Sequence, residues 1–176
     1  MRIVTERLIV RNFRMSDIND LHEILGDAET MEYCEPAYSY EQTQKFLQDF
    51  CIAQNGAFAV VHKDRQKVIG YVLFKAWETS VYELGWIFNK SFWQQGYAYE
   101  ACSSIIVYAF EKLNVNKVVA ETIDAQKSIG LMKKLGMKLA EIQKDAAKDT
   151  FGNPTDMYVY EIVKKNDTAR IYEERN

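Results

Sequence analysis

One stretch of the chain joins a strand, a short loop and the start of a helix in an order that suits anion binding. It runs over residues 83–101 and reads ELGWIFNKSFWQQGYAYEA. The first N–H groups of a helix lack internal partners and carry roughly half a positive charge, so they can hold a phosphate without a lysine. Gly96 permits a backbone turn closed to other residues, and the small Ala98 leaves the first helical turn accessible. Glycines also occupy ordinary turns, so this segment alone is compatible with either a phosphate site or a plain turn.

The other residue types that often carry chemistry are few and scattered. Three cysteines (Cys34, Cys51 and Cys102) form no CxxC pair, and the only histidines are His22 and His62. This fits neither a disulfide framework nor a zinc site, so we expect reduced thiols and no metal. Phosphate-binding patterns of the GxxxxGK[ST] and GxGxxG types are absent from the sequence.

The elements that must position this junction follow from hydrophobic periodicity. Alternating and β-branched runs predict strands at residues 8–13, 57–62, 67–77, 82–88, 117–122, 137–146 and 155–163. Helices are predicted from Ser16, from Ser39 to a left-handed end at Asn55-Gly56, over 96–113 and over 128–135. Ser39 and Gln42 have the spacing of a capping box.

This order predicts a mixed α/β (α+β) fold. Three consecutive strands at 57–88 form an antiparallel meander, and a strand-helix-strand unit is added to it. The helix at 96–113 is apolar on nearly all sides, as expected of a helix buried against a sheet. We therefore expect a mixed sheet with helices on both faces.

The whole-chain composition limits the function classes. The chain has 176 residues and a net charge of −3, which suits one domain over 1–176 and argues against nucleic-acid binding. Charges in the first seven residues argue against a signal peptide, and no apolar run is long enough to cross a membrane. We expect a cytoplasmic protein that does not contact membranes. From Lys164 onward the charged end indicates no regular structure.

Three blocks of sequence resemble the GNAT acetyltransferase superfamily, and within it the ribosomal-protein N-acetyltransferase (RimJ/RimL-like) branch. They are TERLIVR at 5–11 with Ser16-Asp17, WQQGYAYEA at 93–101 and SIGLMKKLGM at 128–137. The order of predicted elements also matches, so the resemblance covers approximately residues 1–163. It implies a mostly antiparallel GNAT-like sheet of six to seven strands with a splayed pair at its centre.

The resemblance also implies the co-substrate, acetyl-CoA. Its pantetheine arm is expected between the strands at 82–88 and 117–122, and its pyrophosphate on the amides that follow Gln94. Amides near Ile87 and Phe88 would face the thioester oxygen, and we expect a β-bulge there because a bulge re-aims such groups. The cofactor-binding residues implied in this way are Trp86, Ile87, Phe88, Gln94, Gln95, Gly96, Tyr97, Ala98, Tyr99 and Ser128.

The sequence departs from the family pattern at three places. Gln94-Gln95 replaces a frequent Gly-Lys pair, which removes one positive charge from the loop. Ala125 stands where the family usually has an asparagine, at a cost of about 1 kcal/mol in hydrogen bonding. Met132 stands where other members of the superfamily use a tyrosine as general acid, so that role cannot fall there.

Acetyl transfer requires a neutral amine and a stabilised thiolate. A protein α-amine is roughly a tenth neutral at pH 7 and a lysine under about 0.1%, so an N-terminal acceptor needs only a weak base. Glu83 is the leading candidate for the base, with Glu121 as the rival and a plain exposed strand carboxylate as the alternative. Ser128 matches the family serine near the CoA sulfur, where it could protonate the thiolate, although serine also favours a helix N-cap.

The acceptor is expected to enter from the side opposite CoA. Tyr33, Glu35 and Tyr38, with Pro36, border this entrance in the loop between the first two helices. Their acidic character is compatible with a protein N-terminus, a polyamine or an aminoglycoside-like amine. A non-catalytic acyl-CoA-binding module remains the alternative from another class, and both a monomer and a homodimer remain open. A flavodoxin-like nucleotide binder fits poorly because of the antiparallel meander.

Overall fold

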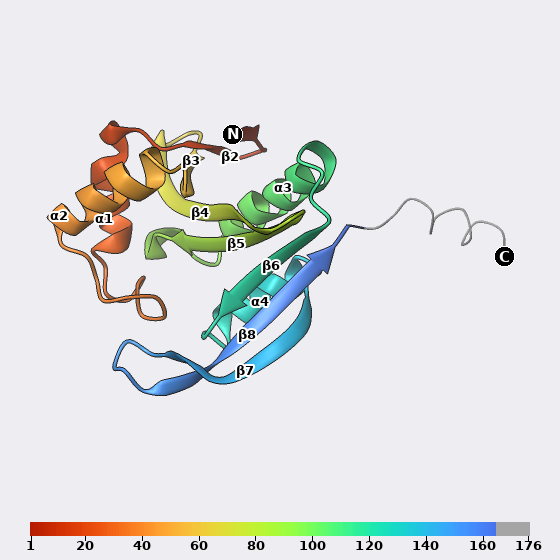
Figure 1. Cartoon of the computed structure of the whole chain (residues 1–176). Helices are drawn as coiled ribbons and strands as arrows, with labels where there is room; N and C mark the ends of the chain where they lie inside the picture. The colour runs from red at the N-terminus through yellow and green to blue at the C-terminus, as the bar shows by residue number, and fades with distance from the viewer. Residues whose placement is uncertain (165–176) are drawn as a thin grey trace.

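A computed structural model describes residues 1–164 as one eight-stranded sheet with helices on both faces (Figure 1). The sheet order is β1-β2-β3-β4-β5-β6-β8-β7. Its strands are β1 (Arg2–Val4), β2 (Leu8–Asn12), β3 (Ala57–His62), β4 (Lys67–Glu78), β5 (Val81–Phe88), β6 (Lys117–Thr122), β7 (Lys138–Lys148) and β8 (Pro154–Val163). The α-helices are α1 (Ile18–Leu25), α2 (Tyr40–Lys45), α3 (Tyr97–Lys112) and α4 (Lys127–Lys134). The expectation of no regular structure near the C-terminus falls on residues 165–176, outside the described residues.

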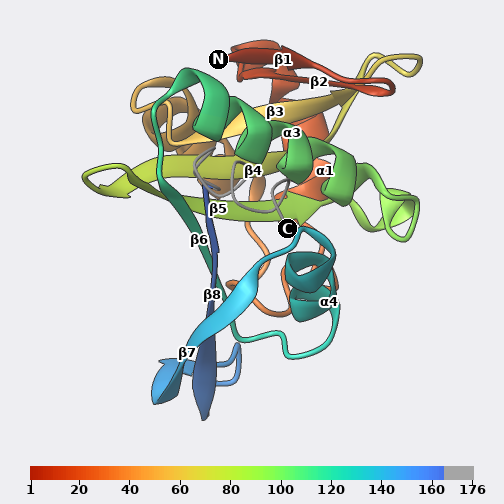
Figure 2. The same cartoon turned by 90° about the vertical axis from the view of Figure 1, so that its right-hand side faces the viewer.

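The expected mixed, mostly antiparallel architecture is confirmed, with one strand more than predicted. The additional strand is β1, which pairs antiparallel with β2 at the edge of the sheet. Three residues are too short a run to show alternation, so periodicity could not reveal this strand. Helices α1 and α2 cover one face of the sheet and α3 and α4 the other, as Figure 2 shows for α1 and α3.

The pair β5 and β6 splits, as the resemblance predicted. They run parallel and pair only over Val81–Glu83 and Lys117–Val119. Beyond Glu83, β5 continues to pair with β4, whereas β6 continues with β8. Figure 2 shows the two strands diverging, with β6 and β8 turning away from β5. The sheet therefore opens into a gap at its centre.

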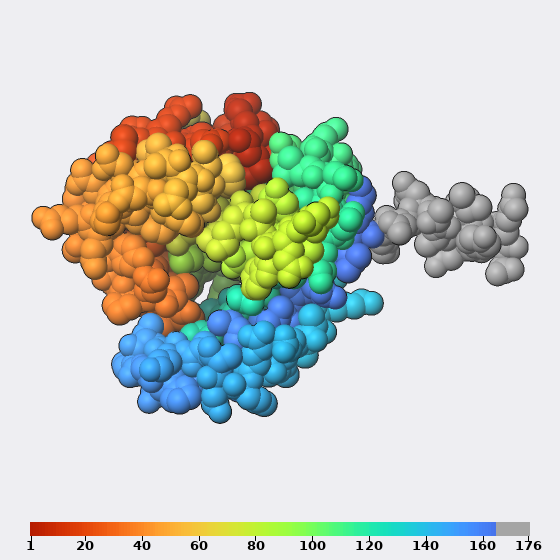
Figure 3. All heavy atoms as spheres, viewed as in Figure 1, coloured from red at the N-terminus to blue at the C-terminus, as the bar shows by residue number. Residues whose placement is uncertain are grey.

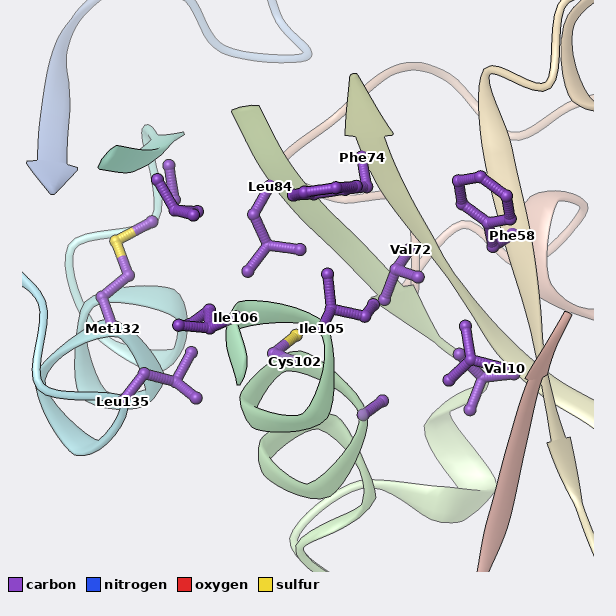
Figure 4. Close-up of a cluster of buried hydrophobic side chains, with 14 of the residues drawn as sticks. Val10, Phe58, Val72, Phe74, Leu84, Cys102, Ile105, Ile106, Met132 and Leu135 are labelled. Atoms are coloured by element: carbon purple, nitrogen blue, oxygen red, sulfur yellow. The ribbon is translucent and has the colours of Figure 1, made fainter. Parts of the chain in front are cut away.

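Helix α3 packs across the sheet beside this gap. Cys102 and Ile105 are fully buried and point toward Val72 and Leu84 in the sheet (Figure 4). Each fully buried isoleucine or leucine stabilises the fold by roughly 1.5–3 kcal/mol. The helix is less buried on its outer side than its sequence indicated, because Val107 remains 52% exposed. Burial raises the pKa of the Cys102 thiol, in keeping with an inert core cysteine.

The predictions for the helix ends are confirmed only in part. The capping box of Ser39 and Gln42 is present at the start of α2, whose chain continues as a π-helix over Phe46–Ile52. Ser16, by contrast, is exposed and caps nothing; the Asp17 carboxylate instead accepts the Arg14 N–H at 2.8 Å. At the end of the second helical segment the left-handed residue is Asn55 (φ +51°).

Candidate active site

A cavity of about 470 Å³ lies where β5, the loop before α3 and the start of α4 meet. The segment between α1 and α2 closes its other side through Thr30, Tyr33 and Cys34. Figure 3 shows the surface hollowed between the orange segment before α2 and the blue β7–β8 hairpin, where the two parts of the sheet separate. Of the predicted site residues, the lining includes Tyr33, Trp86, Ile87, Phe88, Gln94, Gly96, Tyr97, Ala98, Tyr99 and Ser128. The cavity lining does not include Gln95, Glu83, Glu35 or Tyr38.

Gly96 shapes the entrance to α3. It adopts a left-handed conformation (φ +82°) immediately before the helix begins at Tyr97, and Gln94 also has positive φ (+58°). An L-residue with a side chain is strained in this region, so glycine is the suitable residue at position 96. Only one hydrogen bond closes the first turn here, from the Glu100 N–H to the Gly96 carbonyl (3.0 Å). The amides at the start of α3 therefore border the cavity at the positive end of a 16-residue helix.

The backbone of β5 presents hydrogen-bonding groups to the gap. The Asn89 N–H donates to the Ile69 carbonyl in β4 (2.9 Å). Because neighbouring residues of a strand alternate in direction, Ile87 also points its backbone at β4, while Trp86 and Phe88 point theirs at the gap. The Phe88 carbonyl is taken by the Trp93 indole Nε1 (2.7 Å), which leaves the Phe88 N–H and both polar groups of Trp86 facing the gap.

The predicted β-bulge at Ile87 and Phe88 is wrong. Both residues pair in regular register with Tyr71 and Gly70. The nearest register shift lies between β3 and β4, where Val60 pairs with Gly70 but Val61 pairs with Val68, which leaves Ile69 as the extra residue. A second shift in β4, between Ala76 and Glu78, lies at the far end of its pairing with β5. Strand alternation alone turns the β5 groups toward the gap, so no bulge in β5 is needed.

Asp124 organises the start of α4, a role that the sequence did not indicate. Its carboxylate accepts the N–H groups of Gln126 (2.9 Å), Lys127 (3.0 Å) and Ser128 (2.9 Å). Burial raises the pKa of Asp124, but these hydrogen bonds outweigh burial and hold the pKa below its usual value. Ser128 is therefore not the N-cap; it lies inside the first turn, and its hydroxyl donates to Asp124 at 3.2 Å.

The two family departures near α4 have structural explanations. Ala125 is exposed and does not line the cavity, and the neighbouring Asp124 supplies the capping interactions. Met132 is 1% exposed and belongs to the core between α4 and the sheet (Figure 4). Met132 has no group that can donate a proton, and it does not line the cavity.

The candidate bases lie at the narrow end of the gap. Glu83 is the last β5 residue paired with β6. Its carboxylate forms an ion pair with Lys75, the residue opposite it on the neighbouring strand β4 (3.0 Å). Glu121 lies on the same face, two residues beyond the β6 partner of Glu83. Burial raises the pKa of Glu121, and the charge of Glu83 raises it further. A raised pKa brings a carboxylate closer to the operating pH and so makes Glu121 a better proton acceptor than an ordinary carboxylate.

The predicted acceptor residues divide between the cavity and its rim. Tyr33 lines the cavity and is 44% exposed. Tyr38 instead donates its hydroxyl to Glu35 (2.5 Å), and burial followed by this carboxylate raises the pKa of Tyr38 to about 12. Lys90 links this segment to the α3 loop through Asp27 (2.7 Å) and Glu29 (3.3 Å).

Two lysines of α4 also line the cavity, of which Lys127 was not singled out in the sequence. Lys127 lies 4.7 Å from the ring centre of Trp93, and Lys134 lies 4.9 Å from that of Tyr99. Both lysines line the cavity beside the loop where Gln94-Gln95 lacks a lysine. The +7 spacing of these lysines along α4 places them near one side of that helix, a signal that the sequence does contain.

Within residues 1–164, no three His, Cys, Asp or Glu side chains come together as a metal-binding group. No helix in this range has the length and apolar character needed to span a bilayer.

Comparison with known proteins now identifies the family. The family profile described as "Acetyltransferase (GNAT) domain" matches residues 7–138, well over half of the chain. The chain belongs to the GNAT acetyltransferase family. It is an acyltransferase, and the GNAT fold accounts for the split sheet and the α3 loop described above.

Individual GNAT relatives agree with this assignment. The uncharacterized N-acetyltransferase YnaD of Bacillus subtilis (strain 168) is 31% identical over 144 residues, which cover 78% of this chain and 83% of YnaD. A GNAT-family acetyltransferase structure from Bacillus anthracis superposes with a TM-score of 0.86 at 26% identity, covering 93% of this chain and 98% of that one.

The fold is also shared with the RimJ/RimL-like branch. RimL, a ribosomal L7/L12 α-N-protein acetyltransferase solved with coenzyme A, superposes with a TM-score of 0.79 at 20% identity. The alignment covers 92% of this chain and 96% of RimL.

Proposed function

We propose that this GNAT protein transfers the acetyl group of acetyl-CoA to a primary amine by direct attack on the thioester. The observation that carries the proposal is the gap between β5 and β6, which adjoins the cavity at the N-terminus of α3. Unpaired strand groups at Trp86 and Phe88 suit the amides of a pantetheine arm, which would lie there as an added strand does. A diphosphate suits the amides at Gly96, Tyr97 and Ala98.

The charge around the cavity supports a ligand rich in phosphate. Lys127 and Lys134 offer ammonium groups beside the loop, and both stand over aromatic rings that keep them near the cavity. They compensate for the positive charge that Gln94-Gln95 lacks.

In the proposed reaction the amine nitrogen attacks the thioester carbonyl carbon. A C–N bond forms, the C–S bond then breaks, and the amine loses one proton while the thiolate gains one. The N–H groups that β5 turns to the gap would stabilise the charge on the carbonyl oxygen. Ser128 is the proposed proton donor to the thiolate. For this step its hydroxyl turns from Asp124, to which it donates in the unliganded chain, toward the sulfur, and Ser128 then regains a proton from solvent.

Glu83 and Glu121 are the proposed bases at the narrow end of the gap. Glu83 stands nearest the point where the strands part, and its carboxylate is engaged in the ion pair with Lys75. Glu121 has a raised pKa, which favours its use as a proton acceptor. Either carboxylate can accept the amine proton directly or through a water molecule.

The proposed acceptor is a protein N-terminus. An α-amine requires only a weak base, and RimL, which shares this fold, is described as an α-N-protein acetyltransferase. A small cationic amine is the second candidate, because Glu29 lines the cavity and Glu35 lies on the adjoining segment that carries Tyr33.

The deciding experiment incubates the protein with a cell extract and isotopically labelled acetyl-CoA, followed by mass spectrometry of peptides and small molecules. We expect label on protein N-termini. Label on polyamines or aminoglycosides alone would reassign the acceptor. Tight binding of acetyl-CoA in calorimetry with no labelled product would instead support a non-catalytic acyl-CoA-binding module.

A further inference from the structure

Arg7 holds the loop before α3 from outside the cavity lining. Its Nη1 donates to the Gln95 carbonyl (3.0 Å), and its guanidinium carbon lies 4.3 Å from the ring centre of Tyr97. Its Nη2 would be 3.4 Å from a Cβ atom placed on Gly96. One side chain thus contacts Gln95 in the loop and Tyr97 at the start of α3, on either side of Gly96, yet it does not line the cavity.

Arg7 is itself held in place by Glu100, one turn into α3. The Arg7 Nε donates to Glu100 Oε2 (2.7 Å), and the Arg7 backbone N–H donates to Oε1 (2.8 Å). Thr5 donates its hydroxyl to the same Oε1 (2.6 Å). The Glu100 side chain is only 16% exposed, so this cluster forms a partly buried connection between the β1–β2 turn and α3.

This arrangement determines the direction of one amide. In a trans peptide group the C=O and N–H bonds point in opposite directions. The Gln95 carbonyl and the Gly96 N–H belong to the same peptide group. Arg7 takes this carbonyl and does not line the cavity, so we expect the Gly96 N–H, on the opposite side of the peptide group, to point toward the cavity that Gly96 lines.

We propose that Arg7 is a positioning residue for diphosphate recognition, which fixes the Gln95–Gly96 peptide so that its N–H faces the bound diphosphate. The inference rests on the proposed function, since it assumes that acetyl-CoA occupies the cavity. Arg7 acts through the loop backbone and does not touch the ligand. A lysine retains the charge at this position but lacks the guanidinium fork that contacts Gln95 and Glu100 together.

The test compares two donors by calorimetry: acetyl-CoA, and S-acetylpantetheine, which lacks the diphosphate. We expect Arg7→Ala to weaken acetyl-CoA binding by roughly tenfold or more, as for loss of a charge-assisted hydrogen bond. Binding of S-acetylpantetheine should change less than twofold. Arg7→Lys should recover only part of the loss. An equal loss for both donors, or no loss for either, would overturn the proposal.

Two further variants separate positioning from folding. Arg7→Ala leaves the Glu100 charge without its partner, so the double variant R7A/E100Q removes that charge as well and should show the same donor selectivity. Arg2→Ala removes an exposed arginine from the neighbouring β1 and should bind both donors as the unaltered protein does.

A measurement without ligand keeps the inference distinct from the proposed function. If the unaltered protein binds no acetyl-CoA, the proposed function fails. The role of Arg7 is then judged from the ¹⁵N relaxation of the Gly96 amide. A lowered order parameter at Gly96 in Arg7→Ala, but not in Arg2→Ala, supports the positioning role of Arg7. An unchanged order parameter refutes it.

Discussion

At the residue scale, the proton affinity of Glu121 bears on the proposed chemistry. Glu83 and Glu121 share one face of the sheet, and the charge of Glu83 contributes to the raised pKa of Glu121. A pH profile of the rate is therefore expected to respond to substitution of either carboxylate.

The substitutions Glu121→Gln and Glu83→Gln distinguish the bases. The rate should rise with pH as the base loses its proton, and replacing the base should lower kcat by about 10²–10⁴-fold near neutral pH. If Glu121 is the base, Glu83→Gln should only move the rising limb to lower pH, because the neighbouring negative charge is gone. The measurement is kcat/KM against pH with a fixed amine acceptor, and an unaltered profile in both variants would rule out both carboxylates.

Asp124 makes a pH-dependent contribution to stability. Its pKa is lowered by three backbone N–H groups and the Ser128 hydroxyl, so ionised Asp124 stabilises the folded chain above its unfolded pKa of about 3.9. This stability is lost as the pH falls through the lower, folded-state value. Asp124→Ala should lower the free energy of unfolding by about 1–2 kcal/mol at pH 7. In urea unfolding, a difference that stays constant down to pH 3 would contradict this account.

At the scale of elements, the loop between β5 and α3 depends on backbone conformation. Gly96 (φ +82°) borders the cavity, whereas Gly152 (φ +84°) lies in the β7–β8 turn, where an added Cβ would meet no atom within 4 Å. The two glycines share the same backbone conformation but have different surroundings. They provide a matched pair for separating the loss of stability caused by strain from a loss of ligand binding.

Gly96→Asp should weaken acetyl-CoA binding at least tenfold, because it strains the loop whose amides are proposed to hold the diphosphate, and because its Cβ would lie 3.4 Å from Arg7 Nη2, where the carboxylate would compete for the guanidinium that binds Gln95. Gly152→Asp should cost a similar roughly 1 kcal/mol of stability through strain but leave binding unchanged. Thermal unfolding and calorimetry measure the two effects. Intact binding in Gly96→Asp would show that the loop does not receive the diphosphate.

At the scale of the whole molecule, acetyl-CoA bound in the gap between β5 and β6 should stabilise the fold. Acetyl-CoA at 100 times its Kd should stabilise the fold by about 2.7 kcal/mol, which corresponds to a rise of several degrees in Tm. Hydrogen exchange should slow at Trp86 and Phe88 in β5, while amides of the β2–β3 pair remain as they were. Uniform protection across the sheet would indicate general tightening and no ligand in the gap.

Much of the architecture could be predicted from the sequence because its signals are local. β3 and β6 have the predicted bounds, since β-branched and alternating residues define strands within a few positions. The Ser39–Gln42 capping box likewise needs only four consecutive residues. The resemblance extended this reading to the split between β5 and β6 and to the α3 loop.

Other features depended on contacts between residues distant in sequence. Arg7 meets Glu100 across 93 positions, and the extra residue in β4 appears only when that strand is aligned with β3. Ser16 and Ser128 are favourable capping residues, yet aspartates at positions 17 and 124 make the hydrogen bonds. The capping free energies of the alternative residues differ by only about 1 kcal/mol, so local propensity does not decide between them. Tertiary packing decides, because it determines which partners are within reach.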